Sequence, residues 1–283
     1  MATVIPHINH SRSQLRSHLN SYDDGACSLF VSRDVYPDLF DLKHSDVSKK
    51  APNGWKTSKN GSMRYLWFPE LDEDDVATIE DWRARFEKYV LLGLNPHIDG
   101  FFTNELDYCM ALDFNYDPSA EKRSIYGEAE YQLKYQGSRQ HFQVLAHALL
   151  EAIPDLPIPL ACQGNYCISC IPGRPDAASV QYRLGSVVAN KLGVDFIDAD
   201  LNCPKAALKG ITVEQKIPTW QKLYDGGCIE LSESIEDRLV VVVDDLYQSG
   251  ATLWMYAKHL KAQGATHVIG LPCVKSLRDS DNQ

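Results

Sequence analysis

The chain has 283 residues, of which 44% are hydrophobic and 23% are charged, so it is long enough for one or two globular domains with a sizeable core. Its net charge of −10 argues against wholesale electrostatic binding to nucleic acid or anionic membranes, although a local basic patch stays open. The longest apolar runs are far too short to cross a bilayer. The first residues lack a basic region followed by an apolar stretch, so we expect no signal peptide and a cytoplasmic protein.

Residues 1–120 are rich in acidic, aromatic and loop-forming residues, and we expect an α+β region there. One helix is predicted from apolar residues at Val76, Ile79, Phe86 and Val90, behind the acidic run 72–75. Acidic residues in a first helical turn complement the helix dipole, which favours this interpretation of the run. A metal site is the alternative.

The pattern becomes regular after residue 120. Helices are predicted through Phe142 to Leu150, over 180–192 and over 253–260, and strands over 165–171, 194–197, 240–243 and 266–273. Such alternation of strands and helices implies a mostly parallel sheet with helices on both faces. We therefore divide the chain into residues 1–120, of unknown role, and an α/β domain over residues 121–283.

The eight cysteines are scattered, which favours reduced thiols over a disulfide scaffold. Cys167 and Cys170 have C-x-x-C spacing, but no second pair has zinc-ribbon spacing. Both lie in a predicted buried strand, so structural thiols are favoured over a metal or redox site. No phosphate-loop motif of the GxxxxGK[ST] type occurs, and the nine histidines indicate no nucleophilic triad.

The most informative segment starts with four consecutive valines, 240–243, which predict a strand buried on both faces. Asp244 and Asp245 follow, at the end of the strand where open α/β sheets bind ligands. Next comes the short turn 248–252, which leads into a helix whose first N–H groups lack internal partners and favour an anion. A sugar that carries hydroxyls and a phosphate would satisfy both halves of this site.

This stretch resembles the phosphoribosyl pyrophosphate (PRPP) signature of type I phosphoribosyltransferases, and its Asp-Asp-Leu-Tyr-x-Ser-Gly-Ala-Thr form is most similar to the competence-protein, ComF-like branch. The resemblance covers about residues 123–275 and implies a type I phosphoribosyltransferase-like parallel sheet. It implies that Asp244 and Asp245 hold the ribose. It also implies a 5′-phosphate loop, which departs from the usual small residue at its first position and consists of Gln248, Ser249, Gly250, Ala251 and Thr252.

Two further elements follow from the resemblance. The turn after the 165–171 strand matches a pyrophosphate loop, with Pro172, Gly173 and Arg174 as candidates and Arg183 as a weaker one. The long polar stretch between Asp198 and Asp237 matches a flexible lid. Its candidate residues are Lys205, Lys209 and Gly210, with Lys209 expected to stabilise the departing pyrophosphate.

The implied reaction is transfer of a phosphoribosyl group from PRPP to an unidentified acceptor, with pyrophosphate as the leaving group. Mg²⁺ would be the cofactor, bound through PRPP oxygens and water and without direct protein ligands. In this family a hood outside the core selects the acceptor, and here residues 1–120 would supply it or would bind a partner or a second copy.

Two alternatives stay open. The fold can bind PRPP or a nucleotide without chemistry, as a regulator or partner subunit. It can also act as a defence-system effector of the retron or toxin type, because similar chains occur beside antiphage modules and the unmatched N-terminal region suits partner binding.

Overall fold

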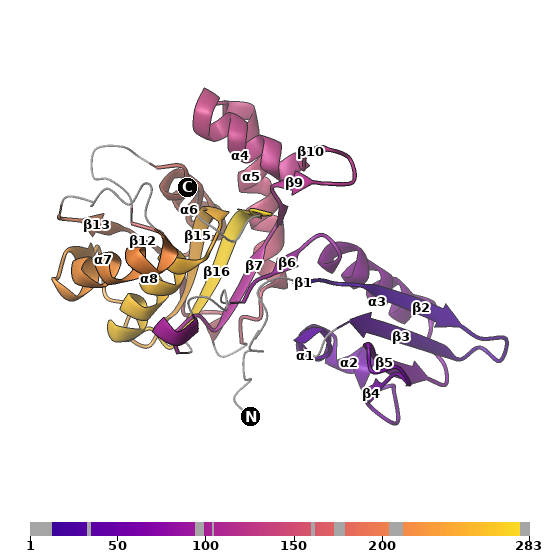
Figure 1. Cartoon of the computed structure of the whole chain (residues 1–283). Coiled ribbons are helices and arrows are strands. Elements are labelled where there is room, and N and C mark those ends of the chain that lie inside the picture. The colour runs from indigo at the N-terminus through magenta and orange to yellow at the C-terminus, as the bar shows by residue number, and fades with distance from the viewer. Residues whose placement is uncertain are drawn as a thin grey trace.

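A computed structural model describes residues 13–32, 35–93, 99–103, 105–159, 162–172, 179–203 and 212–277 (Figure 1). No helix among these residues is long and apolar enough to cross a membrane. The fold is mixed α/β, with a mainly parallel central sheet and helices on both of its faces, as the sequence predicts.

The central sheet has eight strands, and its parallel part has the order β7-β16-β15-β11-β12, with the short strand β8 (Asp113–Phe114) also parallel to β16. Beyond β7, strand β6 pairs antiparallel with β7, and β1 pairs antiparallel with β6. The longest strands, β15 and β16, are adjacent at its centre (Figure 1). The bounds are β1 Ser13–Gln14, β6 Val90–Leu91, β7 Tyr108–Ala111, β11 Tyr166–Cys170, β12 Phe196–Ile197, β15 Leu239–Tyr247 and β16 His267–Lys275.

The valine run is buried on both faces because successive side chains of a strand point in opposite directions. Val241 and Val243 belong to one hydrophobic core, with residues of α5 and α6. Val240 and Val242 belong to a second core, with residues of α7 and α8. The covering helices are α4 Ile125–Gln136, α5 Arg139–Ala152, α6 Val180–Leu192, α7 Val213–Asp225 and α8 Ala251–Ala262.

The predicted helix over 180–192 is confirmed, and it ends as expected at Gly193, whose φ of 68° is left-handed. The helix predicted through Phe142 is also confirmed, as α5. The preceding residues 131–136 are also helical. That segment forms the last turns of α4, which ends at Gly137 with φ 63°. The sequence did not predict α4 as a separate helix because three of its buried residues, Gly127, Ala129 and Glu130, are small or charged. They interrupt the helical repeat of large apolar residues.

The N-terminal region is α+β, as predicted. It contains an antiparallel sheet with the strand order β2-β3-β5-β4. Leu29 and Leu66 point from this sheet into a core with Phe40 and Trp82 of the adjacent helices. The elements are β2 Ser17–Ser21, β3 Cys27–Ser32, α1 Val35–Lys43, α2 Ser45–Ser48, β4 Lys56–Thr57, β5 Met63–Phe68 and α3 Glu73–Phe86.

The acidic run begins α3, which confirms the predicted helix N-terminus. Asp72 caps the helix, and the Asp72 and Asp75 side chains accept reciprocal backbone hydrogen bonds. The predicted extension to Val90 is wrong. The helix ends at Phe86, and Val90 lies in β6, opposite Ala111 of β7, because an apolar residue that follows a helix fits its period equally well when it starts a strand.

The two halves of the chain meet in one sheet and one core. Strand β7, from the first half, pairs with β16 at Tyr108 and Cys109. The buried Asp155 accepts a hydrogen bond from Tyr89 at 2.8 Å and lies 3.5 Å from Arg85. The functional division at residue 120 stays a prediction, and the boundary is not a break in the sheet.

The remaining described elements are short. Two of them, β13 and β14, form an antiparallel ribbon, and β13 follows the edge strand β12 in the sequence. These remaining elements are η1 Asp99–Phe101, β9 Tyr116–Asp117, β10 Lys122–Arg123, η2 Ile153–Asp155, β13 Ala199–Leu201 and β14 Ile229–Leu231.

The cysteines correct one expectation. Cys203 and Cys228 form a disulfide, with their Cα atoms 5.3 Å apart, because the β13–β14 ribbon brings together residues that are 25 positions apart in the sequence. Spacing along the chain contained no sign of this pair. Six cysteines are free, and Cys167 and Cys170 are buried in β11, as expected for structural thiols.

Replacing Trp82 with Ala should destabilise the fold by about 3–5 kcal/mol, because the indole is fully buried between Phe40 and Phe86. Trp67→Ala is the matched control: its side chain is 36% exposed on the same N-terminal sheet, and we expect a loss under about 1 kcal/mol. Urea unfolding of both variants measures the difference. Equal losses would contradict this placement of the core.

Candidate functional site

Strand β15 continues beyond its neighbour β11, and the two acids lie on the part that projects. Pairing between the strands ends at Cys170 and Val243. On the other side, β15 stays paired with β16 as far as Tyr247 and Lys275. Asp244 and Asp245 therefore lie within the strand, three and two residues before its end at Tyr247, and not after it as the valine run suggested. They nevertheless occupy the carboxyl edge of the sheet, past the end of β11.

Asp245 points to the α4 side of the sheet, in keeping with the alternation of β15 side chains. Its carboxylate accepts a hydrogen bond from Lys134 Nζ at 3.0 Å. Lys134 also lies 3.4 Å from the buried Glu130, one helical turn earlier. Burial opposes the charge on Lys134, but Asp245 and Glu130 outweigh it and raise the lysine pKa. The shorter contact makes Asp245 the main partner and fixes the direction of its carboxylate.

For Glu130 the charged form is disfavoured, in contrast to Lys134. Burial raises the pKa of its carboxyl above the ordinary 4.5, and the nearby charge of Asp245 adds to this effect, while Lys134 opposes it. On this face two acidic groups, Glu130 and Asp245, therefore contact one lysine, and the protonated form of Glu130 is favoured relative to a free glutamate.

Asp244 lies on the opposite face from Asp245. Its Oδ1 accepts a hydrogen bond from the Asp245 backbone N–H at 2.9 Å. The side chains of both aspartates are partly exposed, so carboxylate oxygens at this edge reach solvent. Two adjacent carboxylates that face different sides can accept hydrogen bonds from neighbouring hydroxyls of one ligand.

The turn after β15 depends on Gly250. This residue has φ 85° and directly precedes α8. A Cβ atom here would lie 2.1 Å from Tyr247 Oη, so glycine is required by both the backbone and the space. Tyr247 is itself held in place, donating to the Gly93 carbonyl at 3.0 Å and accepting from Trp254 Nε1 at 3.2 Å.

The predicted 5′-phosphate loop lies at the start of α8. Ser249 is buried, and its Oγ accepts from the Ala251 N–H at 3.4 Å. Thr252 is partly exposed in the first turn of α8. The N–H groups of this turn have no intrahelical acceptor, and the dipole of a twelve-residue helix favours negative charge there.

Lys275 binds the backbone of this loop from the end of β16. It is 1% exposed at the end of β16, and its Nζ donates to the Gln248 carbonyl at 3.0 Å and to the Ser276 carbonyl at 2.6 Å. The Ser276 N–H in turn donates to the Tyr247 carbonyl at 2.9 Å. A buried ammonium group thus holds the loop backbone and adds positive charge next to the predicted phosphate loop.

Several predicted site residues lie outside the described part of the chain: Gly173, Arg174, Lys205, Lys209 and Gly210. Pro172 is described and buried, two residues after the end of β11. Arg183 lies in α6 with its guanidinium 5.0 Å from the centre of the Phe142 ring, a cation–π contact with α5. The pyrophosphate and lid roles of these residues stay predictions.

The segment between Asp198 and Asp237 is more regular than expected, because it contains β13, α7 and β14. Tyr224 of α7 packs its ring against Tyr256 and His259 of α8, at centroid distances of 6.4 and 5.3 Å. The sequence pattern missed this helix because Pro218 lies inside it and its residues are mostly polar.

Three functional candidates were not predicted as site residues: Glu130, Lys134 and Lys275. Lys134 lies just before the helix predicted from Phe142, and nothing in the local sequence marks it as a site residue. A lysine at the end of the apolar run 268–274 is the one local signal for Lys275. Lys134 contacts Asp245, which is 111 positions away in the sequence, and Lys275 contacts Gln248, which is 27 positions away. Local sequence patterns do not reveal such contacts.

The structure is similar to solved phosphoribosyltransferases at low identity. One is a hypoxanthine phosphoribosyltransferase from Staphylococcus aureus, with 13% identity, a TM-score of 0.30, and coverage of 49% of this chain and 65% of that chain. Another is an adenine phosphoribosyltransferase from Thermoanaerobacter pseudethanolicus, with 17% identity, a TM-score of 0.30, and coverage of 48% and 70%. A purine phosphoribosyltransferase from Pyrococcus horikoshii has 15% identity, a TM-score of 0.29, and coverage of 47% and 80%.

No family model matches the chain, and no curated protein matches its sequence. The chain spans slightly under two thirds of the Staphylococcus aureus enzyme. At these identities and TM-scores the similarity assigns neither an activity nor a ligand to this chain.

Gly250→Ala should destabilise the protein more than Gly137→Ala. Both glycines have left-handed backbones, which cost a residue with a side chain about 1–2 kcal/mol. Only at Gly250 would the new methyl group clash, because no atom lies within 4 Å of the corresponding position at Gly137. Thermal unfolding of both variants isolates the clash with Tyr247. Equal losses would show that the turn is not packed as described.

Replacing Glu130 with Gln should change how stability depends on pH. A raised folded-state pKa means that this group contributes fully below 4.5 and that its contribution is lost as pH rises through the folded value. The wild type should therefore lose stability relative to Glu130→Gln between pH 4 and pH 7. Urea unfolding across this range tests it, with the exposed Glu233→Gln as the control. A relative gain by the wild type would contradict the burial of an unfavourable charge.

Proposed function

We propose that the chain binds PRPP at the carboxyl edge of its parallel sheet and transfers the phosphoribosyl group to an acceptor, with release of pyrophosphate. The observation that carries this proposal is the arrangement of Asp244 and Asp245 beside the Gly250 turn and the start of α8. It places hydrogen-bond acceptors for hydroxyls next to donors for a phosphate.

Each half of the site has a distinct task. Asp244 and Asp245 accept hydrogen bonds from the ribose hydroxyls, and their charge favours a sugar that becomes cationic as pyrophosphate departs. The loop from Gln248 to Thr252 holds the 5′-phosphate through backbone N–H groups and hydroxyls, and Lys275 keeps that backbone in place. Lys134 orients Asp245 before the ligand arrives. Catalysis then rests on positioning and electrostatics.

The donor set fits Mg²⁺ bound together with PRPP. The ion would be held by PRPP oxygens and water, and the nearby carboxylates of Asp244 and Asp245 would favour its positive charge without coordinating it directly. Magnesium, when bound with PRPP, would neutralise charge on the pyrophosphate leaving group.

We place the chain nearest the ComF-like branch, on the strength of the aromatic residue at Tyr247. In this fold the Tyr247 hydroxyl joins the loop to Trp254 of α8 and to Gly93 of the N-terminal half. That contact supports the proposal that residues 1–120 lie close enough to contribute the acceptor-selecting hood.

The test is calorimetric titration of PRPP with Mg²⁺ into the full chain. Asp244→Asn and Asp245→Asn should each weaken binding about tenfold or more, because each removes a charged hydrogen-bond acceptor. Asp74→Asn, which changes an exposed aspartate of α3, should leave the affinity unchanged. Equal affinities in all four proteins would overturn the assignment of the site.

Activity is tested separately, by following pyrophosphate release while purine and pyrimidine bases, amines and ammonia are offered as acceptors. Release that requires Asp245 supports transfer. PRPP binding without release from any acceptor would instead support a ligand-binding protein that uses the same edge of the sheet.

A further inference from the structure

The outer face of the N-terminal sheet carries an organised row of rings. His18, Phe30, Tyr65 and Lys56 are directly opposite one another on the four strands. The rings of His18 and Phe30 stack with centroids 4.6 Å apart, and those of Phe30 and Tyr65 with centroids 5.1 Å apart. The opposite face of this sheet is buried against helices, so these rings are not part of the core.

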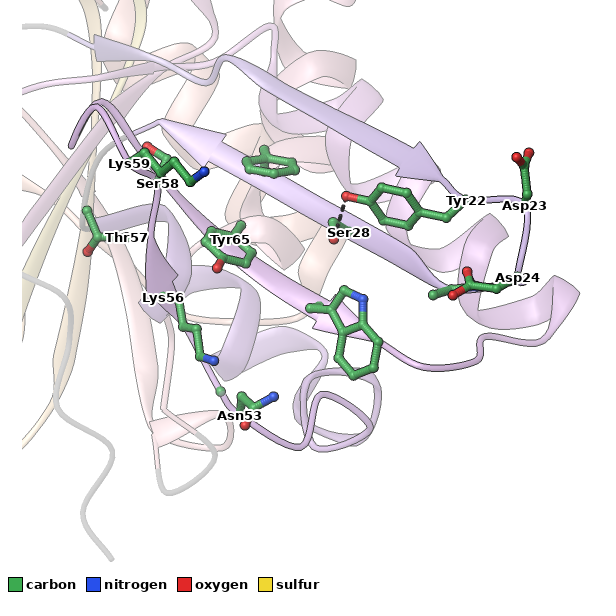
Figure 2. A pocket seen from close by; sticks show the side chains of 14 residues that line it. Tyr22, Asp23, Asp24, Ser28, Asn53, Lys56, Thr57, Ser58, Lys59 and Tyr65 are labelled. Carbon is green, nitrogen blue, oxygen red and sulfur yellow. Dashed lines mark hydrogen bonds between the residues drawn. The ribbon is translucent and has the colours of Figure 1, made fainter.

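A hollow lies next to this stack, over the following row of residues. There the small Ser28 is opposite Trp67, and it accepts a hydrogen bond from the Tyr22 hydroxyl at 3.2 Å (Figure 2). Tyr22 is 45% exposed and Trp67 is 36% exposed. Two large aromatic side chains therefore flank a small floor residue, with Phe30 and Tyr65 as an adjacent wall.

The hollow is a pocket of about 840 Å³, within the range of small-molecule sites. Residues of β3, β4 and β5 and of the loops next to them line it. Among them are the rings of Tyr22, Phe30, Tyr65 and Trp67, the floor residue Ser28, and the charged residues Asp23, Asp24, Lys56 and Lys59.

The charges of the pocket are separated. Lys56 and Lys59 lie toward one end, near β4, and Asp23 and Asp24 lie toward the other, in the β2–β3 hairpin (Figure 2). Both lysines are exposed, and neither ammonium group has a hydrogen bond or ion pair with another described residue. An aromatic middle thus lies between a cationic end and an anionic end.

We propose that this pocket binds a nucleoside monophosphate. The base would stack against Trp67 and Tyr22, where aromatic faces and edges are accessible. Lys56 and Lys59 would hold the phosphate. The Asp23 and Asp24 carboxylates would accept hydrogen bonds from N–H groups of the base.

The dimensions agree with such a ligand. Lys56 is opposite Tyr65 on the neighbouring strand, and Trp67 lies two residues farther along. Two residues of a strand span about 7 Å and neighbouring strands are about 4.8 Å apart, so base and phosphate sites are separated by roughly 8 Å.

Charge favours a free nucleotide over a nucleic-acid strand. Two lysines match one phosphate group, whereas the two carboxylates at the other end and the net charge of −10 oppose a polyanion. None of the lining residues belongs to the 244–252 segment, so this site does not depend on PRPP binding.

The experiment is calorimetric titration of GMP, whose base edge has N–H donors for the carboxylates, into the full chain without PRPP. Trp67→Ala and the double variant Lys56→Ala/Lys59→Ala should each weaken binding about tenfold or more. Lys49→Ala, which removes an exposed lysine of the same region, should not change it. Asp245→Asn should also leave it unchanged, which separates this pocket from the sheet-edge site.

Truncated and extended ligands sharpen the test. Guanosine and ribose 5-phosphate should each bind more weakly than GMP, because each lacks one of the two matched groups. A ten-nucleotide single strand should bind no more tightly than GMP. Tighter, salt-sensitive binding of the strand would overturn the mononucleotide assignment in favour of a nucleic-acid surface.

Three other results would also overturn the proposal: no GMP binding at millimolar concentration, binding unaffected by both pocket variants, or binding lost in Asp245→Asn. Because Lys56 and Lys59 are exposed, their double variant keeps the test decisive even if Trp67→Ala unfolds.

Discussion

The unequal pairing of β15 is the constraint on which the sheet-edge site depends. The strand is bonded to β16 along its whole length, but to β11 only as far as Val243. The projecting part keeps the fixed geometry of a strand while it leaves space beside β11. Two carboxylates can therefore stand at a rigid position and still reach solvent. Their direction is then set by strand alternation and, for Asp245, by Lys134 of α4.

The loop after β15 is held by contacts of three residues. Gly250 permits the turn, Tyr247 fills the space beneath it, and Lys275 binds its backbone from the end of β16. The contact between Tyr247 and Gly93 extends this support to the N-terminal half of the chain. The second pocket, on the aromatic face of the N-terminal sheet, shares no residue with this loop and has its own charge pattern.

Local signals in the sequence predicted much of this fold. The valine run predicted β15, Gly193 marked the end of α6, and the acidic run marked the start of α3. Contacts between distant positions were not predictable in this way. Neither the Lys134–Asp245 pair nor the Cys203–Cys228 disulfide has a periodic or spacing signal. The aromatic stack on β2, β3 and β5 was not predictable either, because His18, Phe30 and Tyr65 are far apart in the sequence. Only the register of the paired strands brings them together.

The most direct measurement of the central claim is a crystal structure of the full chain with PRPP and Mg²⁺. We expect the 5′-phosphate to lie within hydrogen-bond distance of backbone N–H groups at Gly250 to Thr252. We also expect the ribose hydroxyls to contact Asp244 and Asp245. PRPP bound elsewhere on the chain, with this edge of the sheet empty, would contradict the claim.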